Sequence, residues 1–331
     1  MDQTSKELVR NLFELKSQAN VPFMPWVCSF AAQLEQVSIQ TMLSDAGILS
    51  RALINSQKLF GYDVITSVFD PSIEAEACGC ELDWTDDETL PEVVSHPLSE
   101  GASIDDIDTS DLETKGRLPA VLEATKRITI LKGKDVAVAG LITGPLTLGK
   151  HLKGESFLDD LNEGNYDAED IIETAGSIAL KLCRIYCEMG VDLIVIAEEM
   201  IGQLSPEMSH AISSPLRSIW NVARFYNVHS LVLSKGCSDG HIEPILDLQA
   251  DGLAVSGGID NLHLKDAALA RNSCFSRSIP SMDLTGTLSQ VGDSAKACIS
   301  ENGKGLFIST EWDVPYSTNV NNMHEVMSII R

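Results

Sequence analysis

Carboxylates stand directly after several short apolar runs in this 331-residue chain. Asp70 follows one run, the adjacent pair Glu198 and Glu199 follows a second, and Glu311 follows a third. Asp283 lies a few residues beyond a further run. Carboxyl groups placed in this way can transfer protons or hold an amine or hydroxyl of a substrate by hydrogen bonds. The candidate catalytic residues are Asp70, Glu198, Asp283 and Glu311.

Two other runs are followed by a hydroxyl, an ammonium and a thiol. Lys235 could supply the local positive charge that an anionic substrate needs in a chain of net charge −24, or it could pair with Glu198 or Glu311. Cys237 could act as a nucleophile, but the nearest histidine, His241, is four residues further on, so we expect an inert thiol. The candidate substrate-binding residues are Ser234, Lys235, Cys237 and Ser256.

Some of these carboxylates also have a purely structural interpretation. Asp70 precedes Pro71 and a helical pattern, so it could simply cap a helix. Glu198 and Glu199 are adjacent and should point in different directions, so that one lines a pocket while the other caps the following helix. The sequence leaves both alternatives open.

Apolar runs rich in β-formers alternate with helical patterns along the whole chain. Several runs are continuously apolar, as expected for strands buried on both faces. Eight strand–helix units in a chain of this length favour a (β/α)8 barrel, with the active site at the carboxyl ends of the strands. An open doubly wound sheet is the alternative, but no strand is followed by Gly-x-Gly-x-x-Gly. The expected strands are 23–27, 63–69, 136–141, 192–197, 230–233, 252–255, 274–277 and 305–308. Helices are expected over 6–16, 168–189, 206–226 and 293–302.

One segment interrupts this alternation. Residues 81–117 are acidic, contain Pro91 and Pro97 and show little periodicity. We interpret them as a long excursion after the second strand, packed against the barrel. The prediction is a single domain over 1–331 with an N-terminal helical segment.

Composition excludes several classes of protein. The chain has 48 acidic against 24 basic residues, whereas a nucleic-acid binder normally carries a basic face. No apolar run is long enough for a membrane span, and the N-terminal residues do not resemble a secretory signal. Eight cysteines without zinc-finger spacing indicate buried thiols in a reducing compartment. We therefore expect a cytoplasmic enzyme, and a homodimer is compatible with the sequence.

Four segments match one superfamily in order and spacing. They are the acidic turn at 69–79, the Gly-Pro-Leu-Thr-Leu loop within 143–154, the strand and Ser-Pro helix start at 190–207, and the last strand and loop at 309–316. Together they make the chain resemble the uroporphyrinogen decarboxylase and corrinoid methyltransferase superfamily, which implies a (β/α)8 barrel. The arginine-rich N-terminal motif of the decarboxylases is missing, since residues 22–32 contain no arginine.

The nearer resemblance is to the methylcobalamin:coenzyme M methyltransferase branch. It implies methyl transfer with a corrinoid carried by a partner protein, and a zinc held by a His-x-Cys pair and a further Cys. Here Ser234 and Gly236 stand at the first two ligand positions and Trp312 at the third. The sequence therefore argues against zinc, and any zinc would need unexpected ligands such as Glu198, Cys237 and Glu311.

In the branch that the chain resembles, zinc activates the acceptor thiol. Because the zinc ligands are missing here, the sequence favours a methyl acceptor or donor that is not a thiol. A tetrahydrofolate nitrogen as acceptor, or a methoxy aromatic or methylamine as donor, could use the carboxylates for proton transfer. Two alternatives stay open: a decarboxylase-like lyase acting on another substrate with Asp70 stabilising a protonated intermediate, and a barrel that binds a ligand without catalysis.

Overall fold

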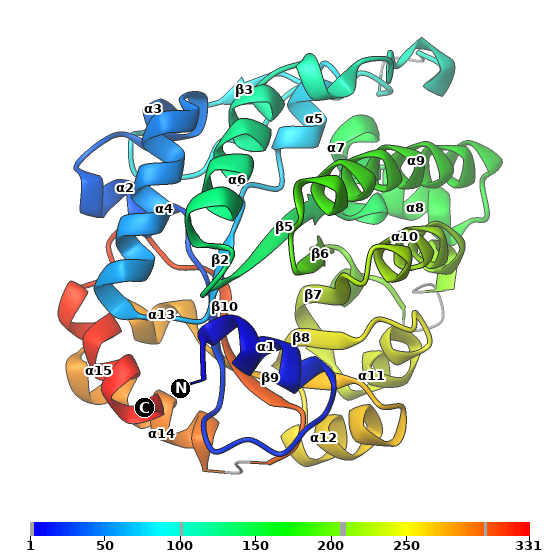
Figure 1. Ribbon diagram of the computed structural model, residues 1–331. Coiled ribbons are helices and arrows are strands. Elements are labelled where there is room, and N and C mark those ends of the chain that lie inside the picture. Colours follow the sequence, from blue (N-terminus) through cyan, green and yellow to red (C-terminus); the bar gives the residue numbers. More distant parts are fainter. Residues whose placement is uncertain (1–2, 100–101, 206–209, 301–302) are drawn as a thin grey trace.

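The computed structural model describes residues 3–99, 102–205, 210–300 and 303–331. Its central sheet has eight parallel strands in the order β1-β10-β9-β8-β7-β6-β5-β2, which curve into a barrel flanked by helices (Figure 1). The predicted (β/α)8 fold is confirmed, and each of the eight expected strands is present. The strands are β1 (Phe23–Trp26), β2 (Val64–Thr66), β5 (Ala137–Thr143), β6 (Leu193–Ala197), β7 (His229–Ser238), β8 (Gly252–Gly258), β9 (Cys274–Ile279) and β10 (Leu306–Asp313).

Asp63 closes the seam between the first and last strands of this order. Its backbone N–H donates to the Phe23 carbonyl over 2.9 Å, and its carboxylate accepts from the Phe23 N–H over 2.8 Å. The same buried carboxylate pairs with Arg331 at 2.7 Å and accepts from the Ser5 hydroxyl at 2.7 Å. These bonds tie both ends of the described chain to the seam, where β1 and β2 are not neighbours in the ladder of paired strands.

The helices lie outside the strands, with their apolar faces against the barrel. The long helix α9 begins after Asn165, whose side chain accepts from the Asp167 N–H, and ends at Gly190 in the left-handed conformation. The larger helices are α1 (Ser5–Phe13), α2 (Ser29–Glu35), α3 (Ile39–Ser44), α4 (Ala46–Phe60), α6 (Leu118–Lys132), α7 (Pro145–Lys153), α8 (Phe157–Asn162), α9 (Tyr166–Met189), α10 (Ser213–Phe225), α11 (Asp239–Leu246), α12 (Asn261–Ala270), α14 (Leu288–Ile299) and α15 (Val320–Ile330). The short ones are α5 (Ile73–Ala77) and α13 (Ser281–Leu284).

The predicted helices differ from the structure at their ends. The helix expected over 6–16 ends at Phe13, and the one expected over 168–189 begins at Tyr166. The helix expected over 206–226 begins at Ser213 in the described part, and residues 206–209 lie outside the described residues. The helix expected over 293–302 begins earlier, at Leu288, because Thr287 and Gln290 form a capping box there. It ends at Ile299, and residues 301–302 lie outside the described residues.

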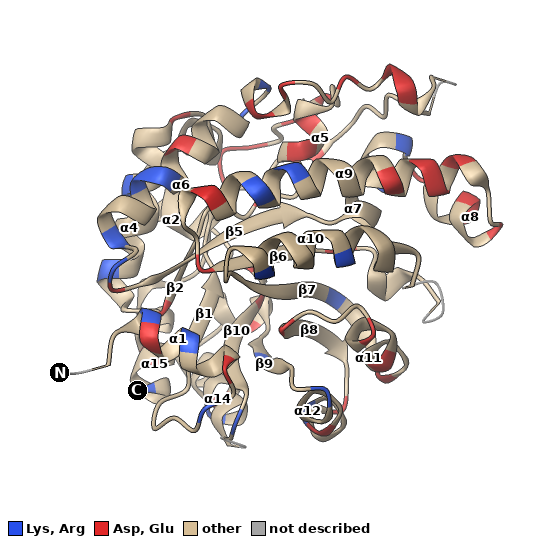
Figure 2. Ribbon diagram, turned by 45° about the vertical axis from the view of Figure 1, so that its right-hand side comes forward, with Lys and Arg blue, Asp and Glu red and all other residues tan. Residues whose placement is uncertain are grey.

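The segment over 81–117 runs beyond the ends of α5 and α7 at the top of Figure 1. It contains a short antiparallel pair, β3 (Leu82–Asp83) and β4 (Glu92–Val93), and two 3-10 helices, η1 (Ile104–Asp106) and η2 (Leu112–Thr114). The Leu98 N–H donates to the Leu152 carbonyl of α7 over 2.9 Å. Acidic residues are frequent on this segment, α5 and α8 (Figure 2). No helix within the described ranges is long and apolar enough to span a bilayer.

Candidate active site

A cavity of about 470 Å³ lies at the carboxyl ends of the barrel strands. In parallel barrels this end carries the active site, because the loops that follow the strands converge there. The segment over 81–117 supplies one wall of the cavity, and the loops after β2 and β6, helix α7 and strand β10 supply the others. The lining residues are Asp70, Pro71, Ser72, Leu90, Pro91, Glu92, Val93, His96, Lys150, His151, Glu155, Glu199, Met200, Gln203 and Trp312.

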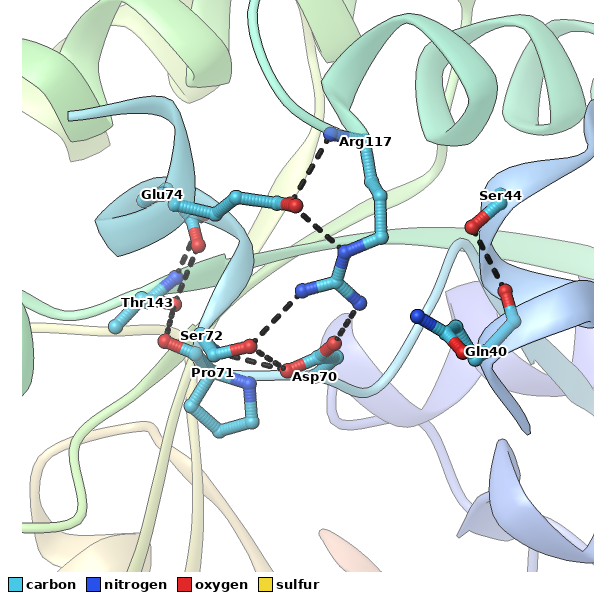
Figure 3. A network of polar contacts seen from close by, with 9 residues as sticks. Gln40, Ser44, Asp70, Pro71, Ser72, Glu74, Arg117 and Thr143 are labelled. Atoms are coloured by element: carbon cyan, nitrogen blue, oxygen red, sulfur yellow. Dashed lines mark hydrogen bonds and ion pairs between the residues drawn. The ribbon is translucent and has the colours of Figure 1, made fainter. Parts of the chain in front are cut away.

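Asp70 lines this cavity, but its carboxylate is held by protein groups on both oxygens. One oxygen accepts from the backbone N–H of Ser72 at 2.9 Å and from its hydroxyl at 2.7 Å, and the other pairs with the Arg117 guanidinium (Figure 3). Arg117 also donates to Ser72 Oγ at 3.0 Å and to Glu76 at 2.7 Å. Asp70 and Arg117 are almost fully buried, so each compensates the charge of the other. This network anchors the loop after β2 to the start of α6.

Glu198 is fully buried behind the cavity and caps helix α7. Its carboxylate accepts from the Leu146 and Thr147 N–H groups, both at 3.0 Å, and from the Thr147 hydroxyl at 2.9 Å. A carboxylate is stabilised there by the unpaired N–H groups and the positive end of the helix. Burial nevertheless raises the pKa of Glu198 to about 7. The neighbouring Glu199 points elsewhere and lines the cavity.

Lys235 pairs with Glu199, not with Glu198 or Glu311. Its Nζ lies 2.5 Å from Glu199 Oε1 and 4.6 Å from the centroid of the Trp312 ring. This is a cation–π contact combined with an ion pair. Phe69 packs edge-on against the same indole, with the ring centroids 4.9 Å apart, and fixes its orientation.

The other two candidates on β7 are buried below the mouth of the barrel. Ser234 is fully buried, and its Oγ accepts from Cys237 Sγ at 3.5 Å. Burial raises the pKa of the Cys237 thiol, so it is protonated at neutral pH. Between them Gly236 has a φ of +69°, at the point where the register of β7 against β8 shifts.

The remaining candidates gather around a second cavity of about 330 Å³, which Ser256 and Glu311 both line. The Ser256 hydroxyl donates to Glu311 Oε1 at 3.4 Å. Asp283 accepts from the hydroxyl of Ser294, a residue that lines this cavity from α14. The structure therefore divides the sequence-based candidates. Asp70 lines the first cavity, and Lys235 contacts two of its lining residues from beside it. Ser256 and Glu311 line the second cavity, Asp283 contacts its lining residue Ser294, and Glu198, Ser234 and Cys237 lie in the buried layer beneath.

The sequence reasoning did not find His151, which lines the first cavity from α7. Burial lowers the pKa of His151 to about 4, so its imidazole is neutral at physiological pH. Its Nδ1 atom is buried and has no hydrogen-bond partner within the described ranges. The His151 carbonyl is held by His96 Nδ1 at 2.8 Å. A histidine inside a helical pattern carries no signal by which the sequence alone could distinguish it from a surface residue.

The residues at the zinc-ligand positions do not fit a zinc ion. Ser234 offers a buried hydroxyl that is engaged by Cys237, and Gly236 has no side chain. At the third position the Trp312 ring lies against the Lys235 ammonium, a cation that would repel a second one. In the part of the chain that the structure describes, no three His, Cys, Asp or Glu side chains are grouped to hold a metal.

The chain belongs to the uroporphyrinogen decarboxylase family, whose model matches residues 4–331. Among curated proteins it is similar to the methylcobamide:CoM methyltransferase MtbA of Methanosarcina mazei, with 25% identity over 212 residues and 61% of each chain covered. It is also similar to the methylcobamide:CoM methyltransferase MtaA of Methanosarcina barkeri, with 27% identity over 166 residues and 48% of each chain covered. These matches span less than two thirds of the relatives' length.

Solved structures support the same fold. A methyltransferase from Methanosarcina mazei superimposes with a TM-score of 0.86 at 20% identity, covering 99% of this chain and 98% of that one. A B12-independent methionine synthase from Shewanella sp. W3-18-1 gives a TM-score of 0.55 at 12% identity, with 85% and 84% covered. At these identities the structural similarity establishes the barrel fold alone, and the reaction has to be argued from the residues of the site.

Proposed function

We propose that this chain transfers a methyl group between a corrinoid carried by a partner protein and a small acceptor or donor other than a zinc-activated thiol. The similarity to two methylcobamide:CoM methyltransferases supports the corrinoid. The contact of Lys235 with Trp312 supports the second half of the proposal, because an indole with an ammonium against it stands at a position where the family resemblance would expect a metal ligand. A reduced folate nitrogen, a methylamine and a methoxy aromatic fit this description.

The corrinoid is a second substrate in this reaction, and it supplies or takes up the methyl group by in-line displacement at carbon. Residues 90–93 form one wall of the cavity, against which the small substrate would lie. Glu199 lines the cavity beside Trp312, and its partner is a flexible lysine, so it is a group that can accept or return a substrate proton there. Asp70 keeps the loop after β2 in place through Arg117.

Decarboxylation of a substrate with many carboxylates is less well supported. Recognition of such a substrate requires several cationic side chains. Of the described residues that line the cavity, Lys150 is the one Lys or Arg, and it already pairs with Glu155 at 3.3 Å. Arg117 lies next to the cavity, but Asp70 and Glu76 engage it.

The experiment follows the corrinoid by its absorbance. Purified chain is mixed with free methylcob(III)alamin and a reduced folate or a thiol, and in the reverse direction cob(I)alamin is mixed with methylamines or methoxy aromatics, each with and without a zinc chelator. We expect turnover with a non-thiol substrate that the chelator does not change. Turnover that requires both a thiol and added zinc would contradict the proposal, as would its absence with every substrate.

Trp312→Leu and Lys181→Met provide the matched variants for this assay. Trp312→Leu removes a wall of the cavity, so methyl transfer should fall at least about tenfold. Lys181 pairs with Glu113 away from the cavity, and its substitution should leave the rate unchanged. Equal rates of methyl transfer in the two variants would show that the reaction does not take place in this cavity.

A further inference from the structure

Trp312 and Glu199 together form a binding arrangement for a cation. Both line the first cavity, and both are contacted by the same ammonium, that of Lys235. Lys235 itself is not among the cavity-lining residues, so its ammonium reaches them from beside the cavity. An indole and a carboxylate can also hold a monovalent cation on their cavity side, and the repulsion from the Lys235 ammonium then lowers the affinity of that cation.

The charge of the cavity also favours a cation over an anion. Asp70, Glu92, Glu155 and Glu199 line it against the single cationic side chain of Lys150 among the described lining residues. Asp70 and Glu155 have cationic partners in Arg117 and Lys150. Glu199 is compensated by Lys235 from outside the cavity. With a net charge of −24 the protein attracts cations over longer range as well.

The remaining wall of the cavity suits methyl groups. Leu90, Pro91, Val93 and Met200 present apolar surface to the cavity. On α7, the buried Nδ1 of His151 has no partner within the described part of the chain. Buried polar atoms normally have a hydrogen-bond partner. This nitrogen has almost no accessible surface, so the ligand assignment does not rest on it. A methylated nitrogen would pack its methyl groups against this apolar surface, whereas a bare ammonium has no methyl groups to place there.

We infer that the first cavity binds a methylated ammonium cation as the methyl donor, with its charge against Trp312 and Glu199 and with Lys235 limiting its affinity. The claim that the ligand donates its methyl group rests on the proposed function, whereas the claim that the cavity binds a cation does not. In the transfer the C–N bond breaks and its electron pair stays on nitrogen, so a quaternary ammonium leaves as a neutral amine. The reduced Co(I) corrinoid of the partner protein supplies the electron pair of the new bond to carbon and becomes Co(III).

Calorimetric titration of the purified chain tests the ligand class without any need for turnover. The probes are choline, its neutral isostere 3,3-dimethylbutan-1-ol, and acetate as an anion. We expect choline to bind roughly tenfold more tightly than the neutral isostere, because only the cation interacts with the Trp312 ring and Glu199. Equal affinities for choline and the isostere, or tighter binding of acetate, would overturn the inference.

Substitutions locate the site and test the role of Lys235. Lys235→Met leaves Glu199 without its cationic partner, so choline should bind several-fold more tightly, roughly five- to tenfold. Lys181→Met makes the same change in net charge at a distant ion pair and should leave the affinity unchanged. Trp312→Leu should weaken choline binding roughly tenfold, whereas Trp312→Phe retains a ring and should weaken it less.

Each outcome has a separate meaning. Tighter choline binding by Lys235→Met would be specific evidence for the inference. If Lys235 had only a structural role, its removal would weaken choline binding or leave it unchanged. An unchanged or weaker affinity in this variant, or equal effects of Trp312→Leu and Trp312→Phe, would overturn the inference. If choline binds as expected but cob(I)alamin is never methylated by any donor, the cation site stands and the proposed methyl transfer fails.

Discussion

Glu198 Oε2 accepts hydrogen bonds from both the backbone N–H and the side-chain hydroxyl of Thr147, at 3.0 and 2.9 Å. The first residue after β6 is thereby fixed to the first turn of α7. The Thr147 hydroxyl also accepts from the Glu199 N–H at 2.8 Å, so the same threonine positions the neighbouring cavity carboxylate. Since α7 also carries His151, one buried acid aligns two walls of the cavity.

Stability should fall as the pH rises toward neutral. Burial raises the pKa of Glu198, Glu74 and Asp313 to about 7, from ordinary values of 4.5, 4.5 and 3.8. Between about pH 4.5 and 7 these three carboxyls bind more protons in the folded chain than in the unfolded chain, so their contribution to the free energy of unfolding decreases as the pH rises. His151, whose pKa is lowered to about 4, offsets part of this decrease below about pH 6.5. Above about pH 7 all three carboxyls are ionised in both states, and this contribution no longer changes.

Urea unfolding at about pH 5.5 and about pH 7.5 measures this dependence, which amounts to about 1.4 kcal/mol per pH unit for each proton of difference. Glu198→Gln keeps the size of the side chain and removes one titrating group, so its slope with pH should be shallower. Asp266→Asn, on the exposed face of α12, is the control and should retain the original slope. Identical slopes in all three proteins would show that Glu198 titrates normally.

Gly144 should not tolerate a methyl group. A Cβ at this position would lie 2.1 Å from Cδ of Glu198, although the backbone φ of −72° suits any residue. Gly144→Ala should therefore destabilise the protein by about 1–3 kcal/mol through overpacking alone. Gly258→Ala, where a Cβ meets nothing within 4 Å, should have little effect.

A double-mutant cycle identifies the cause of this effect. Glu198→Asp shortens the side chain, so Gly144→Ala should destabilise less in the Glu198→Asp background than in the original chain. Thermal or urea unfolding of the four proteins gives the coupling energy. Strict additivity of the two substitutions would mean that the clash lies elsewhere.

Replacing Arg117 should cost more than breaking an exposed ion pair. Arg117→Met leaves the carboxylate of Asp70, which is 2% exposed, without a counter-charge, at a cost of about 3–5 kcal/mol. Asp70→Asn in the same chain removes the stranded charge and should restore part of that loss. Arg127→Met breaks the exposed pair with Glu123 and should cost no more than about 0.5 kcal/mol. If urea unfolding showed equal losses in the free energy of unfolding for Arg117→Met and Arg127→Met, the buried network would be contradicted.

Local sequence patterns were sufficient to predict the barrel, because buried parallel strands appear as continuous apolar runs. The strand expected over 192–197 matches β6, which spans Leu193–Ala197. The strand expected over 230–233 is shorter than β7, which continues to Ser238. The polar continuation is a strand because Cys237 and Ser238 pair with Gly257 and Gly258 of β8 beyond a shift in register. Pairing of this kind depends on a neighbouring strand and leaves no local pattern.

The site was less predictable than the fold, because its contacts join distant parts of the chain. Arg117 is 47 residues from Asp70, and no spacing rule connects the end of an acidic excursion to the loop after β2. The choice between Glu198 and Glu199 also depends on where α7 begins, and α7 precedes both residues in the chain. Physical patterns indicated which end of the barrel holds polar residues, but only the three-dimensional arrangement assigns partners to them.

The purified chain should contain no stoichiometric zinc, even after expression in zinc-supplemented medium. A tetrahedral zinc site needs at least three Cys, His, Asp or Glu ligands, and here Ser234, Gly236 and the Trp312 ring stand at the positions concerned. The Lys235 ammonium 4.6 Å from that ring adds electrostatic repulsion. Metal analysis by mass spectrometry, before and after dialysis against a chelator, measures the content. Lys235→Met is the informative variant: it removes the repulsion without adding a ligand, so it should also remain free of zinc. One zinc per chain that survives dialysis in either protein would contradict both the ligand assignment and the zinc-free methyl transfer built on it.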